Sequence, residues 1–358
     1  MRLSVDTVTS FLHGRGVITP DTPTTATVLA GGVSGATFLV YAGGVRYVVK
    51  QPLPFLAVAD EWPARQERAG VEAAALGWLA DLTPGHLPRL LDYDPSEFVL
   101  TMTAAPPGWA EWRSVLLGGR VDVAAGATLG RVLGTWHASS AGAPERLATY
   151  GDLTMFLELR GDPYHRTVAA RRPDLAEPVL ACLDELLTRQ SCLVHGDFSP
   201  KNVLVGAAVG AADASGTPAA DLWVLDFEVA HAGNPVFDVA FLLHHLVMKA
   251  VHLSTTGSAG ARCAAELLAC ADAFRAEYAA AGGLAVDEAA VVRHTGALLL
   301  ARVHGKSPAA YLSADGAAEV SALGAHAVTG ELGSVAELFP HAPGPPADQP
   351  DVGRTVSR

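Results

Sequence analysis

This 358-residue sequence contains little cysteine, fewer basic than acidic residues, and only short uninterrupted apolar stretches. The four cysteines show no CxxC spacing, which disfavours a zinc site or a disulfide framework and indicates the reduced thiols of a cytoplasmic protein. The 25 lysines and arginines face 37 acidic residues, and the formal net charge of -12 argues against a general affinity for nucleic acid or anionic membranes.

Membrane and secretion signals are also weak. The apolar segment Val236–Val251 contains Asp238, two histidines and Lys249, so we expect it to fall short of the roughly 18 apolar residues that a membrane span needs. Met1–Val17 lacks the apolar core of a signal peptide. Because 50% of the residues are hydrophobic, the chain can bury a sizeable core, and its length suits two domains or lobes.

Residues 1–104 carry the pattern of a small antiparallel sheet with one helix. Glycine-containing turns separate three β-like segments: Thr27–Val33, Thr37–Tyr41 and Val45–Gln51. Pro63–Ala80 changes to helical spacing, Phe98–Thr103 is a short buried strand, and Ala104–Gly108 forms a hinge. This stretch therefore predicts an N-terminal lobe that ends at residue 104.

Helical patterns dominate residues 105–339, which we expect to form a larger C-terminal lobe. Apolar stripes predict five packed helices: Val121–Ser139, Asp174–Arg189, Val236–Leu253, Gly260–Ala281 and Val286–Val303. Three short strands interrupt them: Leu193–His195, Val203–Val205 and Leu222–Asp226. Gly206–Ala220 is rich in alanine and glycine, which is typical of an inserted loop. Residues 340–358 hold several prolines and few apolar residues, which predicts a disordered tail.

Two polar clusters flanked by strands are the most informative feature. The first is L-V-H-G-D-F-S-P-K-N-V-L-V at 193–205, and the second is W-V-L-D-F-E at 223–228. Phosphoryl transfer from ATP requires a carboxylate beside the attacking hydroxyl and oxygen ligands for magnesium ions. Asp197, Asn202 and Asp226 can supply these groups. Such residues are also common in turns for local reasons, but the β segments around both clusters favour the catalytic interpretation.

This pattern resembles the aminoglycoside phosphotransferase and choline kinase superfamily, relatives of the protein kinases whose catalytic loop follows the pattern H-G-D-x-x-x-x-N. The resemblance spans about residues 25–315. It implies an α+β, bilobal protein-kinase-like fold, with a small antiparallel-sheet N-terminal lobe and a larger, mainly helical C-terminal lobe. It also implies that Asp197 orients or deprotonates the substrate hydroxyl, and that Asn202 and Asp226 hold Mg²⁺.

Two features are similar to methylthioribose kinases in particular. Glu228 replaces the glycine of the protein-kinase D-F-G triplet, and an Asp-x-Glu pattern implies that it is a second oxygen ligand for the metal; a solvated strand-end glutamate is the alternative. The stretch from Lys50 to Glu72 also resembles those kinases. Ser199–Asn202 is closer to the general aminoglycoside phosphotransferase pattern, so the resemblance does not extend to one subfamily.

Several N-terminal residues are predicted to bind the nucleotide. A glycine-rich turn that includes Gly32, Ser34 and Gly35 can cover the phosphates with backbone N–H groups, although an ordinary turn would look the same. Met102 and Thr103 directly precede the hinge and complete the predicted nucleotide site.

Lys50 ends a strand of residues suited to burial, where a lysine can reach the α- and β-phosphates. Glu72, on the following helix, is predicted to pair with it, and Glu67 is the alternative partner. The competing interpretations are a solvated strand-end lysine and a surface carboxylate.

Trp112 and Arg302 are candidates for the substrate pocket, because indole and guanidinium groups suit hydroxylated or planar ligands. Core packing and structural ion pairs use the same groups. The resemblance further implies that Asp238 braces the catalytic loop. We interpret His244 and His245 as packing residues, because consecutive positions on a helix diverge by about 100°.

These features predict an ATP- and Mg²⁺-dependent O-phosphotransferase that acts on a hydroxyl of a small molecule, namely a sugar, an amino sugar or a nucleoside-type antibiotic. A methylthioribose-type sugar kinase and a non-catalytic nucleotide-binding pseudokinase are the alternatives. A protein kinase is disfavoured because no Ala-Pro-Glu segment follows Asp226. The acidic balance favours a neutral or cationic acceptor over an anionic one. The sequence leaves the oligomeric state and the choice between ATP and GTP open.

Overall fold

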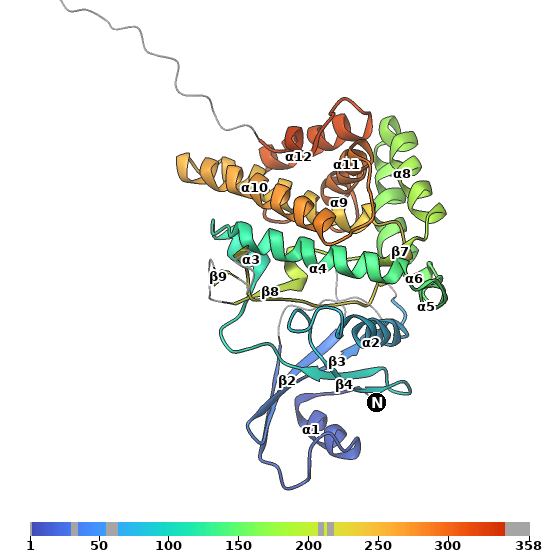
Figure 1. The fold of residues 1–358 in the computed structure, drawn as a ribbon, viewed down its shortest axis with the longest axis vertical. Helices are drawn as coiled ribbons and strands as arrows, with labels where there is room; N and C mark the ends of the chain where they lie inside the picture. The colour runs from blue at the N-terminus through green and yellow to red at the C-terminus, as the bar shows by residue number, and fades with distance from the viewer. Residues whose placement is uncertain (1, 30–34, 55–63, 207–210, 213–217, 341–358) are drawn as a thin grey trace, which may run out of the picture.

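A small lobe built on a sheet and a larger lobe built from helices make up the molecule (Figure 1). The computed structural model describes residues 2–29, 35–54, 64–206, 211–212 and 218–340. The α+β, bilobal architecture expected from the sequence is confirmed, with an antiparallel sheet in the small lobe and mainly helices in the larger one.

The small lobe contains a five-stranded antiparallel sheet in the order β1-β2-β3-β5-β4. Its strands are β1 (Thr24–Val28), β2 (Gly35–Ala42), β3 (Val45–Pro52), β4 (Leu90–Asp94) and β5 (Val99–Thr103). β2 and β3 are joined at Gly43 and Gly44, whose φ angles of 57° and 82° lie in the left-handed region that glycine enters without strain. Because β3 is the central strand, Lys50 near its end lies beside Leu100 of β5.

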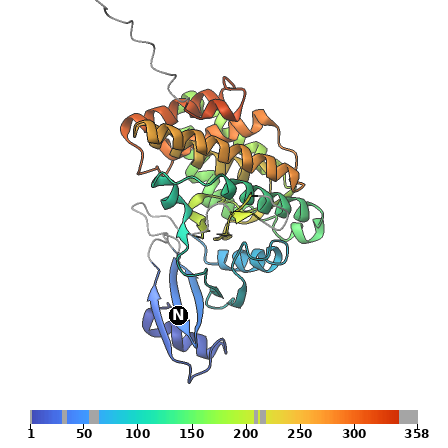
Figure 2. The same cartoon turned by 60° about the vertical axis from the view of Figure 1, so that its left-hand side comes forward.

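Two helices cover the sheet in different places. α1 (Val5–Gly14) closes a small core in which Val8 and Leu12 pack with Phe38 and other strand residues. The buried residues of α2 (Arg68–Leu79) belong instead to the main core, which continues into the large lobe. Figure 2 shows α2 next to the large lobe and α1 at the far end of the small lobe. α2 therefore connects the sheet to the helical lobe.

The large lobe consists mainly of helices. They are α3 (Trp112–Leu117), α4 (Val123–Ala141), α5 (Pro144–Ala148), α6 (Thr154–Phe156), α7 (Thr167–Arg171), α8 (Ala176–Thr188), α9 (Val236–Ser254), α10 (Ser258–Ala280), α11 (Glu288–His304) and α12 (Ala314–Val328), with a π-helix at Leu157–Arg166 and 3-10 turns η2 (Pro173–Leu175), η3 (Pro200–Asn202) and η4 (Val335–Leu338). Short strands between them are β6 (Ala110–Glu111), β7 (Cys192–Val194), β8 (Val203–Val205), β9 (Ala211–Ala212), β10 (Pro218–Ala219), β11 (Leu222–Val224) and β12 (His231–Gly233).

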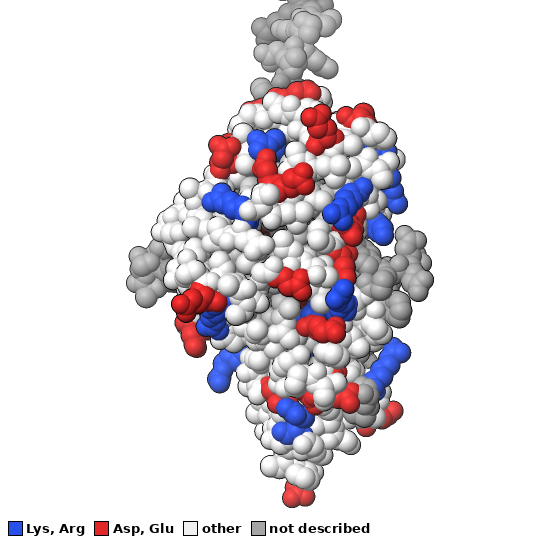
Figure 3. Space-filling view, turned by 90° about the vertical axis from the view of Figure 1, so that its right-hand side faces the viewer, with Lys and Arg blue, Asp and Glu red and all other residues white. Residues whose placement is uncertain are grey.

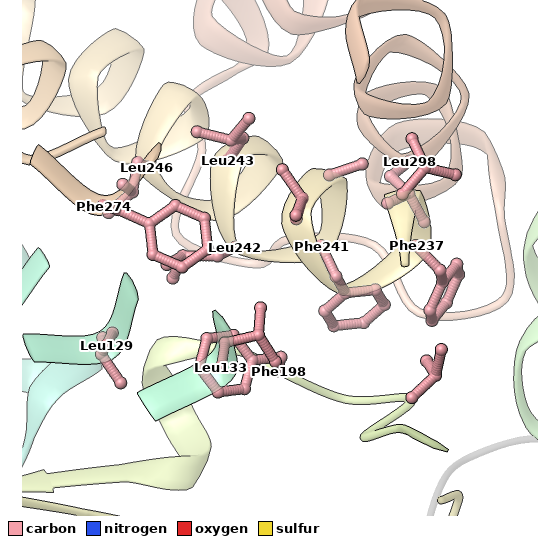
Figure 4. Close-up of a cluster of buried hydrophobic side chains, with 14 of the residues drawn as sticks. Leu129, Leu133, Phe198, Phe237, Phe241, Leu242, Leu243, Leu246, Phe274 and Leu298 are labelled. Carbon is pink, nitrogen blue, oxygen red and sulfur yellow. The ribbon is translucent and has the colours of Figure 1, made fainter. Parts of the chain in front are cut away.

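α9 is the central helix of the large lobe. Its side chains pack against the catalytic-loop residue Phe198, Leu133 of α4 and Phe274 of α10 in one hydrophobic core (Figure 4). Among the described residues it is the one helix long and apolar enough to cross a membrane, whereas the sequence analysis expected this segment to fall short of a membrane span. However, 94% of its most apolar 18-residue stretch is buried inside the protein. The helix is apolar because it is the core of this lobe.

The predicted elements differ from the structure in a few places. The helix expected from Pro63 begins at Arg68, since the described residues 64–67 are not helical. The expected loop Gly206–Ala220 contains the short pair of strands β9 and β10. The elements that were not predicted include α1, β4, β6, α3, β12, α12 and the helical turns between residues 144 and 171. Residues 341–358, within the predicted tail, lie outside the described residues.

Candidate active site

The catalytic loop connects β7 to β8 and is fixed by a buried carboxylate. Asp238, in the first turn of α9, accepts the backbone N–H of His195 at 2.6 Å and that of Gly196 at 3.0 Å. Gly196 has a φ of 80°, and a Cβ at this position would lie 2.5 Å from the carbonyl oxygen of Val229. Only glycine fits there. The prediction that Asp238 braces the loop is confirmed.

Asp238 is in turn held by a buried histidine. His137 Nε2 lies 3.3 Å from the Asp238 carboxylate, and its Nδ1 lies 3.0 Å from the Tyr278 hydroxyl. Burial alone raises the pKa of Asp238, but the hydrogen bond and charge of His137 outweigh it and keep that pKa below its usual value. His137 is therefore a packed, hydrogen-bonded residue.

Asp197 lies in the loop with its carboxylate between two cations. Arg160 and Lys201 each place a nitrogen 2.9 Å from its Oδ2, and Asn202 donates from Nδ2 to its backbone carbonyl at 3.0 Å. Burial raises the pKa of Asp197, but the positive charges of Arg160 and Lys201 outweigh it and lower that pKa overall. The carboxylate is thus ionised and fixed in position.

Asp226 follows β11 in an unusual backbone conformation. Its φ of 70° lies in the left-handed region, which is uncommon for a residue other than glycine and occurs where the surroundings impose it. Its Oδ1 accepts a short 2.5 Å hydrogen bond from Lys50 Nζ. That contact joins the two lobes directly, since Lys50 belongs to β3.

Lys50 is the centre of an ionic cluster. Its Nζ lies 2.7 Å from Glu72 Oε2 and 3.8 Å from Glu228 Oε2. The predicted pairing of Lys50 with Glu72 is confirmed, and Glu67, the alternative partner, is exposed. Burial lowers the pKa of Lys50, but Asp226 and Glu72 outweigh it and raise that pKa well above its ordinary value. The lysine is therefore charged.

Glu228 is buried, at 7% exposure, so its interpretation as a solvated strand-end residue is wrong. It accepts a hydrogen bond of 3.0 Å from Arg68 Nε. The Arg68 side chain is fully buried and also donates to the carbonyl groups of Leu53, Ala64 and Arg65. The arginine therefore fixes the position of the Glu228 carboxylate.

Three carboxylates converge at this point of the interlobe junction. Oxygen atoms of Glu72, Asp226 and Glu228 all lie within 4.8 Å of one another. Burial raises the pKa of Glu72 to about 7, even though Lys50 lowers it. Lys50 and Arg68 supply two positive charges beside three carboxylates, of which Glu72 is partly protonated near pH 7. A hard divalent cation prefers oxygen ligands of this kind, and the donor set therefore fits Mg²⁺.

The other residues that were predicted to bind the nucleotide either lie on the sheet of the small lobe or are not among the described residues. Gly35 begins β2 opposite Pro52, and Met102 and Thr103 lie on β5 beside Val48 and Tyr47. Gly32 and Ser34 fall outside the described residues.

The two predicted substrate residues are placed differently from each other. Trp112 is 1% exposed and packs in the main core, where it also lines a cavity of about 420 Å³ beside the hinge. Arg302 of α11 donates from Nη1 to the hydroxyl groups of Ser307 at 2.9 Å and Tyr164 at 3.4 Å. Trp112 and Arg302 therefore have different surroundings, the main core for one and the hydroxyl groups of Ser307 and Tyr164 for the other.

Sequence reasoning missed three cations that hold the site carboxylates. Arg68 lies one helical turn before Glu72, a spacing that could have suggested a shared face. Lys201 lies inside the catalytic motif, four residues after Asp197. Arg160 had no usable signal, because it belongs to the polar, proline-containing π-helix at Leu157–Arg166.

Comparison with known proteins gives matches of three kinds. A model of the phosphotransferase enzyme family matches residues 25–293. Two curated relatives are methylthioribose kinases. The protein of Pectobacterium atrosepticum is 27% identical over 261 residues, covering 65% of this chain and 62% of the relative. That of Cronobacter sakazakii is 26% identical over 284 residues, covering 70% and 66%. The chain thus spans less than two thirds of the length of either relative.

Solved structures show more distant similarity. A spectinomycin phosphotransferase in complex with ADP and spectinomycin has a TM-score of 0.49 and 12% identity, covering 94% of this chain and 98% of that one. A choline kinase of Streptococcus pneumoniae has a TM-score of 0.46 and 12% identity, covering 90% and 98%. Because the family model spans well over half of the chain and includes Lys50, Asp197 and Asp226, the chain belongs to the phosphotransferase enzyme family.

Proposed function

We propose that this chain catalyses ATP-dependent transfer of the γ-phosphoryl group to a hydroxyl group of a small molecule. The observation that supports it most strongly is the contact between Lys50 of the sheet and Asp226 of the helical lobe, next to Asp197 on its fixed loop. A phosphate-binding lysine, a metal-binding carboxylate and a catalytic carboxylate must meet at one junction for this reaction. Family membership is consistent with this arrangement.

Each residue has a defined part in the proposed reaction. Asp197 orients the acceptor hydroxyl and accepts its proton as the acceptor oxygen bonds to the γ-phosphorus; the bond from that phosphorus to the β–γ bridging oxygen breaks, and ADP leaves. Lys50, fixed by Glu72, contacts the α- and β-phosphates. Asn202, Asp226 and Glu228 would hold Mg²⁺, which neutralises phosphate charge when bound.

The positions of these residues indicate which lobe binds the nucleotide and which binds the acceptor. We infer that residues 1–104 form the nucleotide lobe and residues 105–339 form the catalytic and substrate lobe. The acceptor then binds on the helical side, because its hydroxyl must lie within hydrogen-bond reach of Asp197.

The acceptor class is a polyhydroxylated small molecule, such as a sugar, an amino sugar or a nucleoside-type antibiotic. A methylthioribose-type sugar kinase is a second candidate, favoured by the names of the two curated relatives. A non-catalytic nucleotide-binding protein is disfavoured, because Lys50, Asp197, Asn202 and Asp226 are all present and in contact with one another or with their partners.

An acceptor screen tests the proposal. ADP release is measured with Mg²⁺ and ATP over sugars, methylthioribose, amino sugars, nucleoside antibiotics, choline and homoserine, each against a reaction without magnesium. We expect at least one compound to stimulate ADP release well above the hydrolysis seen without acceptor. If no compound does so while the protein phosphorylates another protein efficiently, the small-molecule assignment is wrong.

A further inference from the structure

Lys249 is a buried lysine that lacks a counter-charge. It lies on α9 with 0% exposure, and its Nζ donates to the carbonyl oxygen of His245 at 3.2 Å, one helical turn back. No carboxylate of the described residues forms an ion pair with it. Glu111, the acidic group that influences it, is already paired with Arg113 at 2.6 Å. Native proteins rarely bury a lysine unless an anion compensates it.

Other unpaired polar atoms surround this lysine. Buried nitrogen or oxygen atoms without a hydrogen-bond partner include Nε of Arg302, Nε2 of His244, Nδ1 of His245 and the hydroxyl of Tyr311. Lys249 Nζ lies 5.6 Å from the centre of the Tyr311 ring. The partners that Arg302 does have, Ser307 and Tyr164, are neutral. We call Lys249, Arg302, His244, His245 and Tyr311 the α9 cluster.

Such a group is unfavourable for folding by itself. Each buried polar atom left without a partner costs about 1–3 kcal/mol, and a buried charge without a counter-charge costs more. Burial, with the positive charge of Arg302 adding to it, lowers the pKa of Lys249 to about 7. Because most buried polar groups in proteins are satisfied, a set of unpaired polar atoms this dense, among them the Nε–H donor of Arg302, indicates a missing binding partner.

The α9 cluster is connected to the catalytic loop through one layer of side chains. Arg160, which pairs with Asp197, places its guanidinium 5.6 Å from the Phe241 ring. The centre of the Phe241 ring lies 4.8 Å from the centre of the His244 ring and 5.7 Å from that of the His245 ring. Figure 4 shows Phe241 projecting from α9 on the side that faces the catalytic-loop residue Phe198.

A second route links the same two places. Arg160 also lies 5.7 Å from the Tyr164 ring, and the Tyr164 hydroxyl accepts from Arg302. One layer of side chains thus separates the cluster from Asp197. His245 is also near enough to Lys201, the other cation on Asp197, for the charge of that lysine to lower the pKa of His245.

We propose that the α9 cluster binds an oxyanion of the acceptor, so that the substrate is a hydroxyl compound that also carries a carboxylate or phosphate group. This inference rests on the proposed function. It departs from the neutral or cationic acceptor that the net charge of -12 suggested. Net charge acts through a field that salt screens beyond about 8 Å, whereas Lys249 and Arg302 act at contact distance inside the protein.

Matched compounds and one buried-lysine variant test the proposal. ADP release is measured with D-gluconate against D-glucitol, D-glycerate against glycerol and ribose 5-phosphate against ribose, with D-glucosamine as a cationic compound. The proteins are wild type, Lys249→Met, Arg302→Gln and the control Lys306→Met, which removes an exposed lysine. Thermal unfolding in sodium sulfate and in sodium chloride at equal ionic strength gives a readout that needs no activity.

The expected results separate binding from folding. An anionic member of a pair stimulates ADP release and its neutral partner does not. In Lys249→Met the KM for that anion rises about 10- to 100-fold, the loss of one charge-assisted hydrogen bond, while the KM for ATP is unchanged and the variant melts no lower than wild type. Sulfate raises the melting temperature of wild type and Lys306→Met relative to chloride, and this gain is reduced in Lys249→Met and Arg302→Gln.

Two other outcomes have distinct meanings. Phosphorylation of neutral or cationic compounds with an unchanged KM in Lys249→Met, or an equal sulfate effect in all four proteins, would overturn the anion site and leave the proposed function intact. Loss of the sulfate effect in Lys249→Met without ADP release from any compound would support the anion site and count against the kinase reaction.

Discussion

Asp197 is held by neighbouring side chains, and we expect the loss of one of them to lower kcat without changing nucleotide binding. Arg160 contacts its carboxylate from the π-helix at 2.9 Å. We expect Arg160→Met to lower kcat by about one to two powers of ten, less than the loss of the acid–base group itself, with the KM for ATP unchanged. Arg166→Met is the matched control, because Arg166 lies on the same helix but is exposed and pairs with Asp162. Equal effects of the two substitutions on kcat would mean that Arg160 does not position Asp197 for the reaction.

Glu228 gives a test of metal binding. We expect Glu228→Gln to raise the magnesium concentration needed for half-maximal activity and to be partly rescued by excess metal, because one oxygen ligand loses its charge. Asp226→Asn should remain inactive at every magnesium concentration. An unchanged magnesium dependence in Glu228→Gln would leave Glu228 as a structural partner of Arg68 only.

Lys249 should make stability depend on pH in a defined direction. Burial lowers its pKa in the folded protein from 10.5 to about 7, so the unfolded chain binds more protons between these values and the free energy of unfolding rises with pH across this window. Lys249→Met removes this contribution, so its stability gain over wild type is largest at or below pH 7 and shrinks towards pH 10. Charged and titratable groups that face this lysine come from α9, α11, β6, α3 and the loop before α12. They are His244, His245, Arg302, Glu111, Arg113 and Tyr311.

Urea denaturation of both proteins at several pH values measures this difference. The two proteins differ only at residue 249, so the difference between their curves reports Lys249 together with its effect on the neighbouring His244 and His245. A difference that does not change between pH 7 and 10 would contradict a depressed lysine pKa.

At the scale of elements, α4 and α10 pack so closely that side chains are excluded from one face. Gly126, Gly130 and Gly134 of α4 lie against the backbone of Cys270, Phe274 and Tyr278 of α10. A Cβ on Gly130 would lie 2.2 Å from the carbonyl oxygen of Phe274, and both atoms belong to rigid helices. The glycines therefore set the distance between the two helices.

Gly130→Ala should destabilise the protein by about 1–3 kcal/mol, the usual cost of overpacking. Gly77→Ala in α2 is the matched control, because a Cβ there meets nothing within 4 Å and alanine is favoured in a helix by roughly 0.5–1 kcal/mol. Urea denaturation should therefore show opposite shifts of the midpoint. A neutral Gly130→Ala would mean that the helices can move apart freely.

The elements that sequence could predict are those with strong local signals. The strands around Asp197 and Asp226 are short apolar runs next to polar motif residues, and α9 and α11 have long apolar patterns, so their positions followed from periodicity. The π-helix that carries Arg160 is polar and contains Pro163, so no pattern marked it. Unpaired atoms such as those around Lys249 depend on tertiary packing, which the sequence does not display.

At the scale of the whole molecule, the two lobes meet through charged side chains. Lys50 binds Asp226, and Arg68 binds Glu228, so both contacts join the N-terminal lobe to the second polar motif. On the face shown in Figure 3, acidic and basic side chains are interspersed over both lobes. The Lys50–Glu72 pair was predicted from the order of these residues along the chain, whereas the contact of Lys50 with Asp226 was not predicted. The role of Arg68 was not predicted either, because it depends on how α2 packs against the helical lobe.

Product analysis tests phosphoryl transfer at Asp197 most directly. With Mg²⁺, ATP and the best acceptor of the screen, wild-type protein should form a phosphorylated acceptor in equal amount to ADP, detected by mass spectrometry. Asp197→Asn should fold and bind nucleotide like wild type but form product about two to four powers of ten more slowly. A variant that keeps more than half of the wild-type rate, or ADP formation without any phosphorylated acceptor, would contradict the proposed reaction.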